Sequence, residues 1–228
     1  SPSANKEFTS IKNAVIQEAL NILHNRITFE EDMQQETETP EETMAYTNET
    51  TSKRNPWTDP NDMHCQYIMG RELLDIDSEN FDPEEGIRLL TLSAMQGFDV
   101  AMYRLGKLYL QGEVVEKNVG EALRWFWEAD AKDNPYAQYQ LGKLYLKGED
   151  VSANYVTAQR MFEKSVRQGN AYAMYSLAKM HLQGTAKYSD IYYAVRLLSE
   201  AAKRGNQWAE YQLGKMYLYG QRVDKDYE

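Results

Sequence analysis

Side chains capable of catalysis are few in this sequence of 228 residues. It has three histidines and one cysteine, at His24, His64, His181 and Cys65. His64 and Cys65 are neighbours, but adjacent side chains on a helix diverge by about 100° and do not form a ready dyad or metal pair. The H-E-x-x-H motif, the phosphate loop and the G-x-G-x-x-G motif are all absent. We therefore expect no catalytic residues, no metal site, no cofactor and no enzyme activity.

A different chemistry recurs along the chain, in which a tyrosine is followed four residues later by a cation. The pairs are Tyr67 and Arg71, Tyr103 and Lys107, Tyr139 and Lys143, Tyr175 and Lys179, and Tyr211 and Lys215. A further aromatic residue precedes the last three tyrosines, at Tyr136, Tyr172 and Trp208. Residues four apart share one face of a helix. Tyrosine offers rigid contact area and lysine offers charge, which suits a peptide that carries carboxylates.

The elements that would position these pairs repeat every 36 residues. Blocks restart at Cys65, Ala101, Ala137, Ala173 and Ala209. In the second block Ala101, Leu105 and Leu108 have the i, i+4, i+7 spacing of one helical face. Trp125 and Phe126 supply the apolar positions of a second helix in the same block. Each block therefore predicts two helices, and Cys65, which stands where the other blocks have alanine, is expected to be a small core residue.

Residue types at the expected helix ends support this interpretation. The second helices open with strong N-cap residues, at Asp82, Asn118, Asn154, Asp190 and Asp226. Glycines stand where a left-handed C-cap would end the first helices, at Gly112, Gly148, Gly184 and Gly220. Glu85 and Glu121 lie three residues after their caps and predict capping boxes. Gly142, inside a first helix, predicts a close approach to the second helix.

The pattern A-x-x-x-L-G-x-x-Y-x-x-G, repeated at this period, resembles the Sel1-like repeat, a relative of the tetratricopeptide repeat. The residues of one block that match it position by position are Ala137, Leu141, Gly142, Tyr145 and Gly148. The resemblance covers residues 65–228 and implies an all-α, right-handed α-α solenoid. Its first helices would line the concave surface, and its function would be that of a noncatalytic scaffold for protein-protein interaction.

On that concave surface we expect a protein or peptide partner, acidic in character, to bind. The candidate partner-binding residues are Tyr103, Lys107, Tyr139, Lys143, Tyr175, Lys179, Tyr211, Lys215, Tyr136, Tyr172 and Trp208. The alternative interpretation is that the tyrosines only pack adjacent helices, while the lysine stems cover them.

Two other functions stay open. The stretch YQLGKLYLKGEDV, and N-P-W-T-D before the repeats, resemble repeat regions appended to conjugative mobilisation proteins (relaxases). The chain would then be an accessory C-terminal region whose catalytic domain lies upstream. A secreted bacterial repeat protein that engages a host or envelope partner is the third possibility, and it would need a signal peptide upstream.

Three regions are expected along the chain. They are an amphipathic helix at 1–28, an acidic linker at 29–62 that is disordered in part, and a solenoid at 63–228 with blocks 65–100, 101–136, 137–172, 173–208 and a partial 209–228. Residues 1–62 hold five basic and twelve acidic side chains, so a charge of -7 out of the total of -10 belongs there.

Charge and cysteine content exclude several further classes. A net charge of -10 disfavours direct binding to nucleic acid or to an anionic membrane. The apolar stretch from Phe8 to Ile27 carries Lys12, Glu18 and Arg26, which disfavours a membrane span. One cysteine excludes an intramolecular disulfide framework. We expect a cytoplasmic piece of a longer protein, with dimerisation possible through the exposed end of the solenoid.

Overall fold

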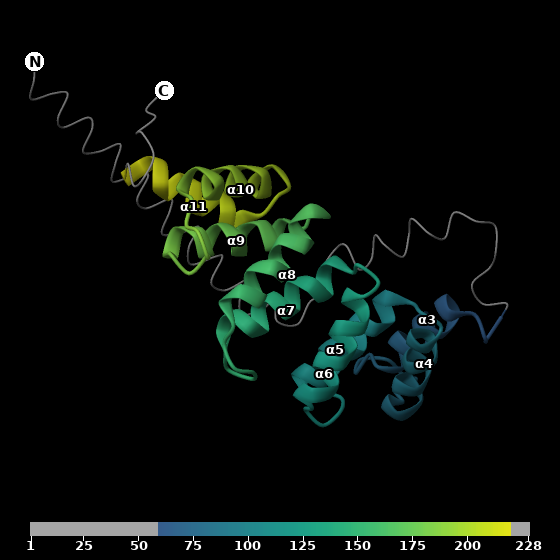
Figure 1. Ribbon diagram of the computed structural model, residues 1–228. Coiled ribbons are helices and arrows are strands. Elements are labelled where there is room, and N and C mark those ends of the chain that lie inside the picture. Colours follow the sequence, from purple (N-terminus) through teal and green to yellow (C-terminus); the bar gives the residue numbers. More distant parts are fainter. Residues whose placement is uncertain (1–58, 220–228) are drawn as a thin grey trace, which may run out of the picture.

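The computed structural model describes residues 59–219, and this range contains nine helices and no strand. The helices are α3 (Met63–Leu73), α4 (Pro83–Met95), α5 (Asp99–Gln111), α6 (Val119–Asp130), α7 (Pro135–Lys147), α8 (Tyr155–Arg167), α9 (Ala171–Gln183), α10 (Ile191–Lys203) and α11 (Gln207–Tyr219). Each packs chiefly on its neighbours in the chain, so the hairpins α3–α4, α5–α6, α7–α8 and α9–α10 follow one another in a row and α11 packs against the last of them (Figure 1). The all-α class and the two-helix repeat are confirmed.

The predictions for the two ends of the chain fall largely outside this range. The amphipathic helix at 1–28 and the linker up to residue 58 lie outside the described residues, as do Gly220 and Asp226.

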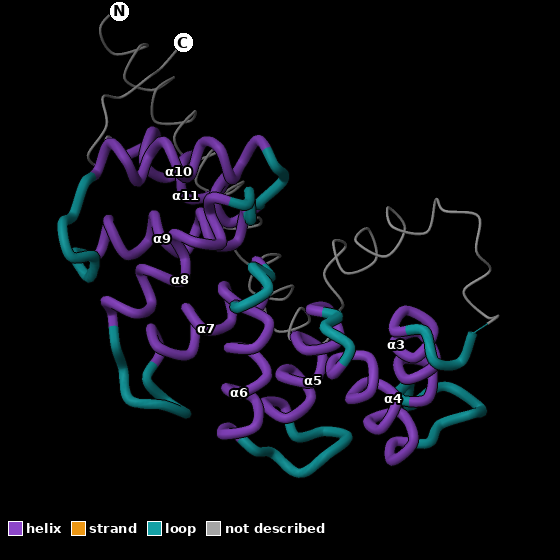
Figure 2. Tube along the Cα trace, turned by 45° about the vertical axis from the view of Figure 1, so that its right-hand side comes forward, coloured by secondary structure: helices purple, strands orange, loops and turns teal. Residues whose placement is uncertain are grey.

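Polar side chains cap the helices at the positions that the sequence predicts. Before the even-numbered helices, Asp82, Asn118 and Asn154 each accept a hydrogen bond from the backbone N–H three residues on, at 3.0–3.1 Å. The first helices of the hairpins end on Gly112, Gly148 and Gly184, whose φ angles of 76°, 72° and 77° are left-handed. Figure 2 shows the turns between helices gathered at the ends of the hairpins. These capping residues therefore help to set where the second helices begin and where the first helices end.

The predicted capping boxes do not form, although the caps themselves do. The backbone N–H of Asp82 donates to the carbonyl of Leu73, and that of Asn118 donates to the carbonyl of Tyr109, each at 2.8 Å. These N–H groups tie the start of one helix to the end of the preceding helix, so they have no need of a glutamate. Glu85 and Glu121 instead form exposed ion pairs within their own helices, with the arginines three residues on at 2.6 Å.

Glycine lets the two helices of a hairpin approach closely, as the sequence predicts. A Cβ atom on Gly142 of α7 would lie 2.5 Å from Cε1 of Phe162 on α8, and a Cβ on Gly106 would lie 2.5 Å from Cε1 of Phe126. Both phenylalanine side chains are fully buried. The aromatic ring of the second helix thus fills the space that a side chain on the first helix would occupy.

Polar groups also join one repeat to the next. Asp130 at the end of α6 accepts hydrogen bonds from Nζ of Lys164 on α8 at 2.7 and 2.8 Å, and from Nε2 of Gln138 on α7 at 2.9 Å. Gln138 is completely buried, and its Oε1 accepts from Gln168 at 2.9 Å. Because buried polar groups are costly unless paired, this network favours one stacking geometry of α6 against α7 and α8.

Candidate binding surface on the odd-numbered helices

The predicted tyrosine and lysine pairs meet in the same way on three successive first helices. The Nζ atom of each lysine lies near the ring centroid of the tyrosine one turn before it. The distances are 5.8 Å for Lys107 and Tyr103 on α5, 5.5 Å for Lys143 and Tyr139 on α7, and 5.9 Å for Lys179 and Tyr175 on α9. We call these six residues the Tyr/Lys stripe. A cation within about 6 Å of a ring centroid is attracted by the ring face.

Aromatic rings join the stripe from one repeat to the next. Tyr103 contacts Tyr136 on α7 at 5.8 Å between centroids, and Tyr139 contacts Tyr172 on α9 at 6.0 Å. Trp208 on α11 closes the series, at 5.9 Å from Tyr172 and 6.5 Å from Tyr175. The three residues that precede the tyrosines in the sequence pattern therefore form the link between consecutive first helices.

Phenylalanine rings of the second helices pack against two tyrosines of the stripe. Tyr103 lies 6.1 Å from Phe126, and Tyr139 lies 6.0 Å from Phe162, between ring centroids. Tyr103 is only 2% exposed, whereas Tyr139 is half-buried. The tyrosines therefore contribute to helix packing. Among the lysines of the stripe, Lys107 and Lys143 are half-buried and Lys179 is exposed.

The ends of the series differ from its middle. Tyr67 on α3 is 1% exposed and packs edge-on against Phe98, at 5.2 Å and 82°. Phe98 thus takes the place that Tyr136 has in the next repeat. Tyr211 and Lys215 continue the sequence pattern on α11, where Tyr211 is half-buried. The sequence pattern alone did not reveal Phe98, although its position 36 residues before Asn134 marks the start of a helix in the same register.

The first helices carry an excess of positive charge. α7 and α9 contain no acidic residue, and the one acidic residue of α5, Asp99, accepts a hydrogen bond from Asn134 at 2.8 Å. Arg104, one turn before Lys107, adds a cation that the tyrosine and lysine pattern leaves out. By contrast, the second helices α4 and α6 pair their exposed arginines with their own glutamates. The lysines of the stripe therefore lie on helices that carry almost no carboxylates of their own.

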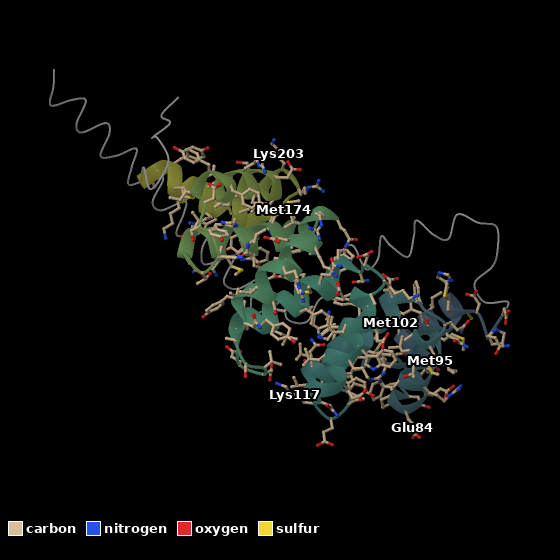
Figure 3. The ribbon with its side chains drawn as sticks, viewed as in Figure 1. Glu84, Met95, Met102, Lys117, Met174 and Lys203 are labelled. Atoms are coloured by element: carbon tan, nitrogen blue, oxygen red, sulfur yellow. The ribbon has the colours of Figure 1, made fainter. Side chains whose placement is uncertain are left out.

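Several other lysines lie outside the stripe. Lys117, in the turn after α5, forms an ion pair with Asp150, in the equivalent turn after α7, at 2.8 Å. Lys117 and Lys203, at the end of α10, both lie at the periphery of the molecule (Figure 3). Lys132 and Lys187 are exposed, as Lys203 is. Lys132, Lys187 and Lys203 can therefore be substituted as controls for changes to the three lysines of the stripe.

Cys65 and His181 are both packed in the interior of the described chain, whereas His24 lies outside the described residues. Cys65 is 2% exposed, and burial, followed by the carboxylates of Asp62 and Asp59, raises the pKa of its thiol. His181 is also buried, with its Nδ1 accepting from the N–H of Asp190 at 3.2 Å and its ring edge-on to Tyr193 at 5.1 Å. Across residues 59–219, no group of three or more His, Cys, Asp or Glu side chains could hold a metal ion.

No helix in the part of the chain that the structure describes is both long enough and apolar enough to cross a membrane.

Comparison with solved structures shows the same architecture in bacterial proteins. A Sel1 repeat protein from Oxalobacter formigenes aligns with a TM-score of 0.67 and 25% identity, over 73% of this chain and 68% of that one. A protective antigen of uropathogenic Escherichia coli strains that displays an SLR fold aligns with a TM-score of 0.68 and 28% identity. That alignment covers 72% of this chain but 35% of the antigen, so this chain spans about a third of its length. Comparison with curated proteins gave no match.

The resemblance to mobilisation proteins finds no support in these comparisons. Of the two stretches on which it rested, N-P-W-T-D lies almost entirely outside the described residues, and YQLGKLYLKGEDV contains residues that pack the hairpin, such as Leu141 and Gly142. Such residues follow from the repeat and carry no information about an upstream domain.

The family model for the Sel1 repeat matches this sequence five times, at residues 64–98, 99–128, 135–170, 171–206 and 209–228. These matches take in most of the chain; the first four correspond to the four hairpins, and the fifth begins within α11. The chain therefore belongs to the Sel1 repeat family.

Proposed function

We propose that this chain is a noncatalytic scaffold that binds an extended peptide segment of a partner protein, through carboxylates, on the Tyr/Lys stripe. The observation that carries the proposal is the threefold recurrence of a lysine over a tyrosine ring, at 5.5–5.9 Å, on α5, α7 and α9. Packing alone would explain the rings, but it does not require a cation at the same place in every repeat.

The geometry suits carboxylates for two physical reasons. Each lysine stem lies along a ring that is itself fixed by the next repeat, so less side-chain entropy is lost when the ammonium group meets an anion. Lys179 is exposed and Lys107 and Lys143 are only half-buried, so pairing with a carboxylate costs less desolvation than it would in the core. Single pairs of this kind contribute about 0.2–1 kcal/mol each, and a segment that contacts three repeats gathers several of them.

Selection from a random displayed peptide library tests this proposal, because it requires no identified partner. The full chain would be immobilised and used to select peptides. The comparison is between the wild type and the triple variant Lys107→Glu, Lys143→Glu, Lys179→Glu. The matched control, Lys132→Glu, Lys187→Glu, Lys203→Glu, makes the same charge change on exposed lysines outside the stripe.

We expect the selected peptides to be rich in Asp and Glu, and to bind the wild type and the control but not the stripe variant. Selected peptides that bind all three proteins equally, while circular dichroism shows equal helicity, would refute the stripe as the binding surface and leave the tyrosines as packing residues.

A further inference from the structure

We propose that residues 30–49 of this chain occupy the Tyr/Lys stripe in the same molecule, so that the binding surface carries its own competing ligand. The proposal rests on the proposed function, because it requires that the stripe accept carboxylates. It concerns the regulation of that surface: an external partner would have to displace the internal segment before it could bind.

Charge complementarity is the first argument. Residues 30–49 contain eight carboxylates, at Glu30, Glu31, Asp32, Glu36, Glu38, Glu41, Glu42 and Glu49. The same twenty residues contain no lysine, arginine or histidine. The helices that carry the stripe show the opposite bias, since α7 and α9 have no acidic residue at all. The most acidic stretch of the chain and its most cationic row of helices therefore match in sign.

Chain length is the second argument. Glu49 and Glu30 lie ten and 29 residues before Asp59, the first described residue, which precedes the start of α3 at Met63. An extended chain covers about 3.3 Å per residue, so the two residues can reach about 33 Å and about 96 Å from Asp59. Helices pack about 10 Å apart, and at most six such steps separate α3 from α9, or about 60 Å. The segment can therefore span α5, α7 and α9.

Tethering makes such an occupant effective even if it binds weakly. A segment on a short flexible tether has an effective concentration on the order of 1 mM. If the free segment bound with a Kd of about 50 μM, the tethered segment would lower the apparent affinity of any competitor about 20-fold.

A labelled peptide tests this directly. The probe is a fluorescein-labelled peptide with the sequence of residues 30–49, and fluorescence anisotropy gives its Kd. The proteins are the full wild-type chain and a full chain in which the eight carboxylates of residues 30–49 are changed to amides. A control chain carries eight such changes at exposed positions elsewhere: Glu79, Glu84, Glu113, Glu116, Glu128 and Glu149 to Gln, and Asp77 and Asp133 to Asn.

We expect the chain with the neutral segment to bind the peptide at least tenfold more tightly than the wild type, whereas the control chain matches the wild type. Adding Lys107→Glu, Lys143→Glu and Lys179→Glu to the chain with the neutral segment should abolish the binding. Equal affinity of the wild type and the chain with the neutral segment, with binding still dependent on the lysines, would overturn self-occupancy and leave the proposed function standing.

Absence of peptide binding to every chain would overturn self-occupancy too, while the proposed function would still be decided by the peptide library. In one further arrangement, residues 30–49 of one copy would occupy the stripe of another copy. Carbodiimide cross-linking of a mixture of light and heavy isotope-labelled chains distinguishes this arrangement from occupancy within one molecule. We expect links from residues 30–49 to Lys107, Lys143 or Lys179 within one copy. Links that join a light copy to a heavy copy would overturn occupancy within one molecule.

Discussion

Replacing Gly142 with alanine tests whether contact between the two helices of a hairpin, rather than helix propensity, decides the stability of this solenoid. Gly142 lies inside α7, where glycine costs about 1 kcal/mol relative to alanine. Propensity alone therefore predicts that Gly142→Ala is stabilising. The structure predicts the opposite sign, because the new Cβ atom would lie 2.5, 2.6 and 2.9 Å from Cε1, Cδ1 and Cζ of Phe162.

The magnitude follows from how little the ring can move. Phe162 is fully buried, and its ring also lies 6.0 Å from that of Tyr139. Overpacking of this kind typically costs about 1–3 kcal/mol. After the gain in propensity is subtracted, we expect Gly142→Ala to lower the free energy of unfolding by about 1 kcal/mol. The larger Gly142→Leu should lower it further, by about 3 kcal/mol.

Gly120 provides the matched control, since it also lies in a helix but faces open space. A Cβ atom there would meet nothing closer than Oδ1 of Asn118, at 3.4 Å. Gly120→Ala should therefore raise the free energy of unfolding, by up to about 1 kcal/mol. Urea denaturation followed by circular dichroism measures both variants. If Gly142→Ala proved as stable as Gly120→Ala, the close approach of α7 and α8 would not constrain this position, and the reasoning would fail.

Two further predictions concern the buried polar network and the cysteine. Asp130→Ala should lower the free energy of unfolding by about 1–3 kcal/mol, because it leaves the buried Gln138 amide and Lys164 without their acceptor. Arg88→Ala, which removes an exposed ion pair, should have a much smaller effect in the same urea titration. Equal losses would show that Asp130 does not hold the repeats together. Cys65 should react with iodoacetamide far more slowly in the folded chain than in urea, since burial raises the pKa of its thiol and excludes the reagent; comparable rates by mass spectrometry would contradict its place in the core.

Most of the fold could be predicted from the sequence, because its determinants are local. A cap such as Asn154 acts on the backbone N–H of Thr157, and Gly148 ends α7 through its own φ angle of 72°. Interactions of this kind extend over one helical turn, and the fixed period repeats them. The capping boxes, which were predicted but do not form, show the limit of local prediction. Glu85 does not reach back to Asp82 because the backbone N–H of Asp82 already donates to the carbonyl of Leu73, a residue of the preceding helix.

The candidate surface was predictable only in part. The recurrence of a tyrosine and a lysine four residues apart placed the two side chains on one face, and the structure brings them within 6 Å in three repeats. A helical wheel puts Tyr103 opposite the core residue Ala101, which suggests exposure, yet Tyr103 is 2% exposed.

The repeat, most of the helix ends and the pairing of residues within a helix thus follow from local sequence. Which of those residues stay accessible depends instead on how the repeats stack. The reason is that the far side of each first helix is covered by the next repeat, as Tyr136 covers Tyr103 and Trp208 covers Tyr175. Burial on a solenoid depends on stacking between successive repeats, whose residues lie 33 positions apart in these two contacts, and Lys179 stays exposed beside them.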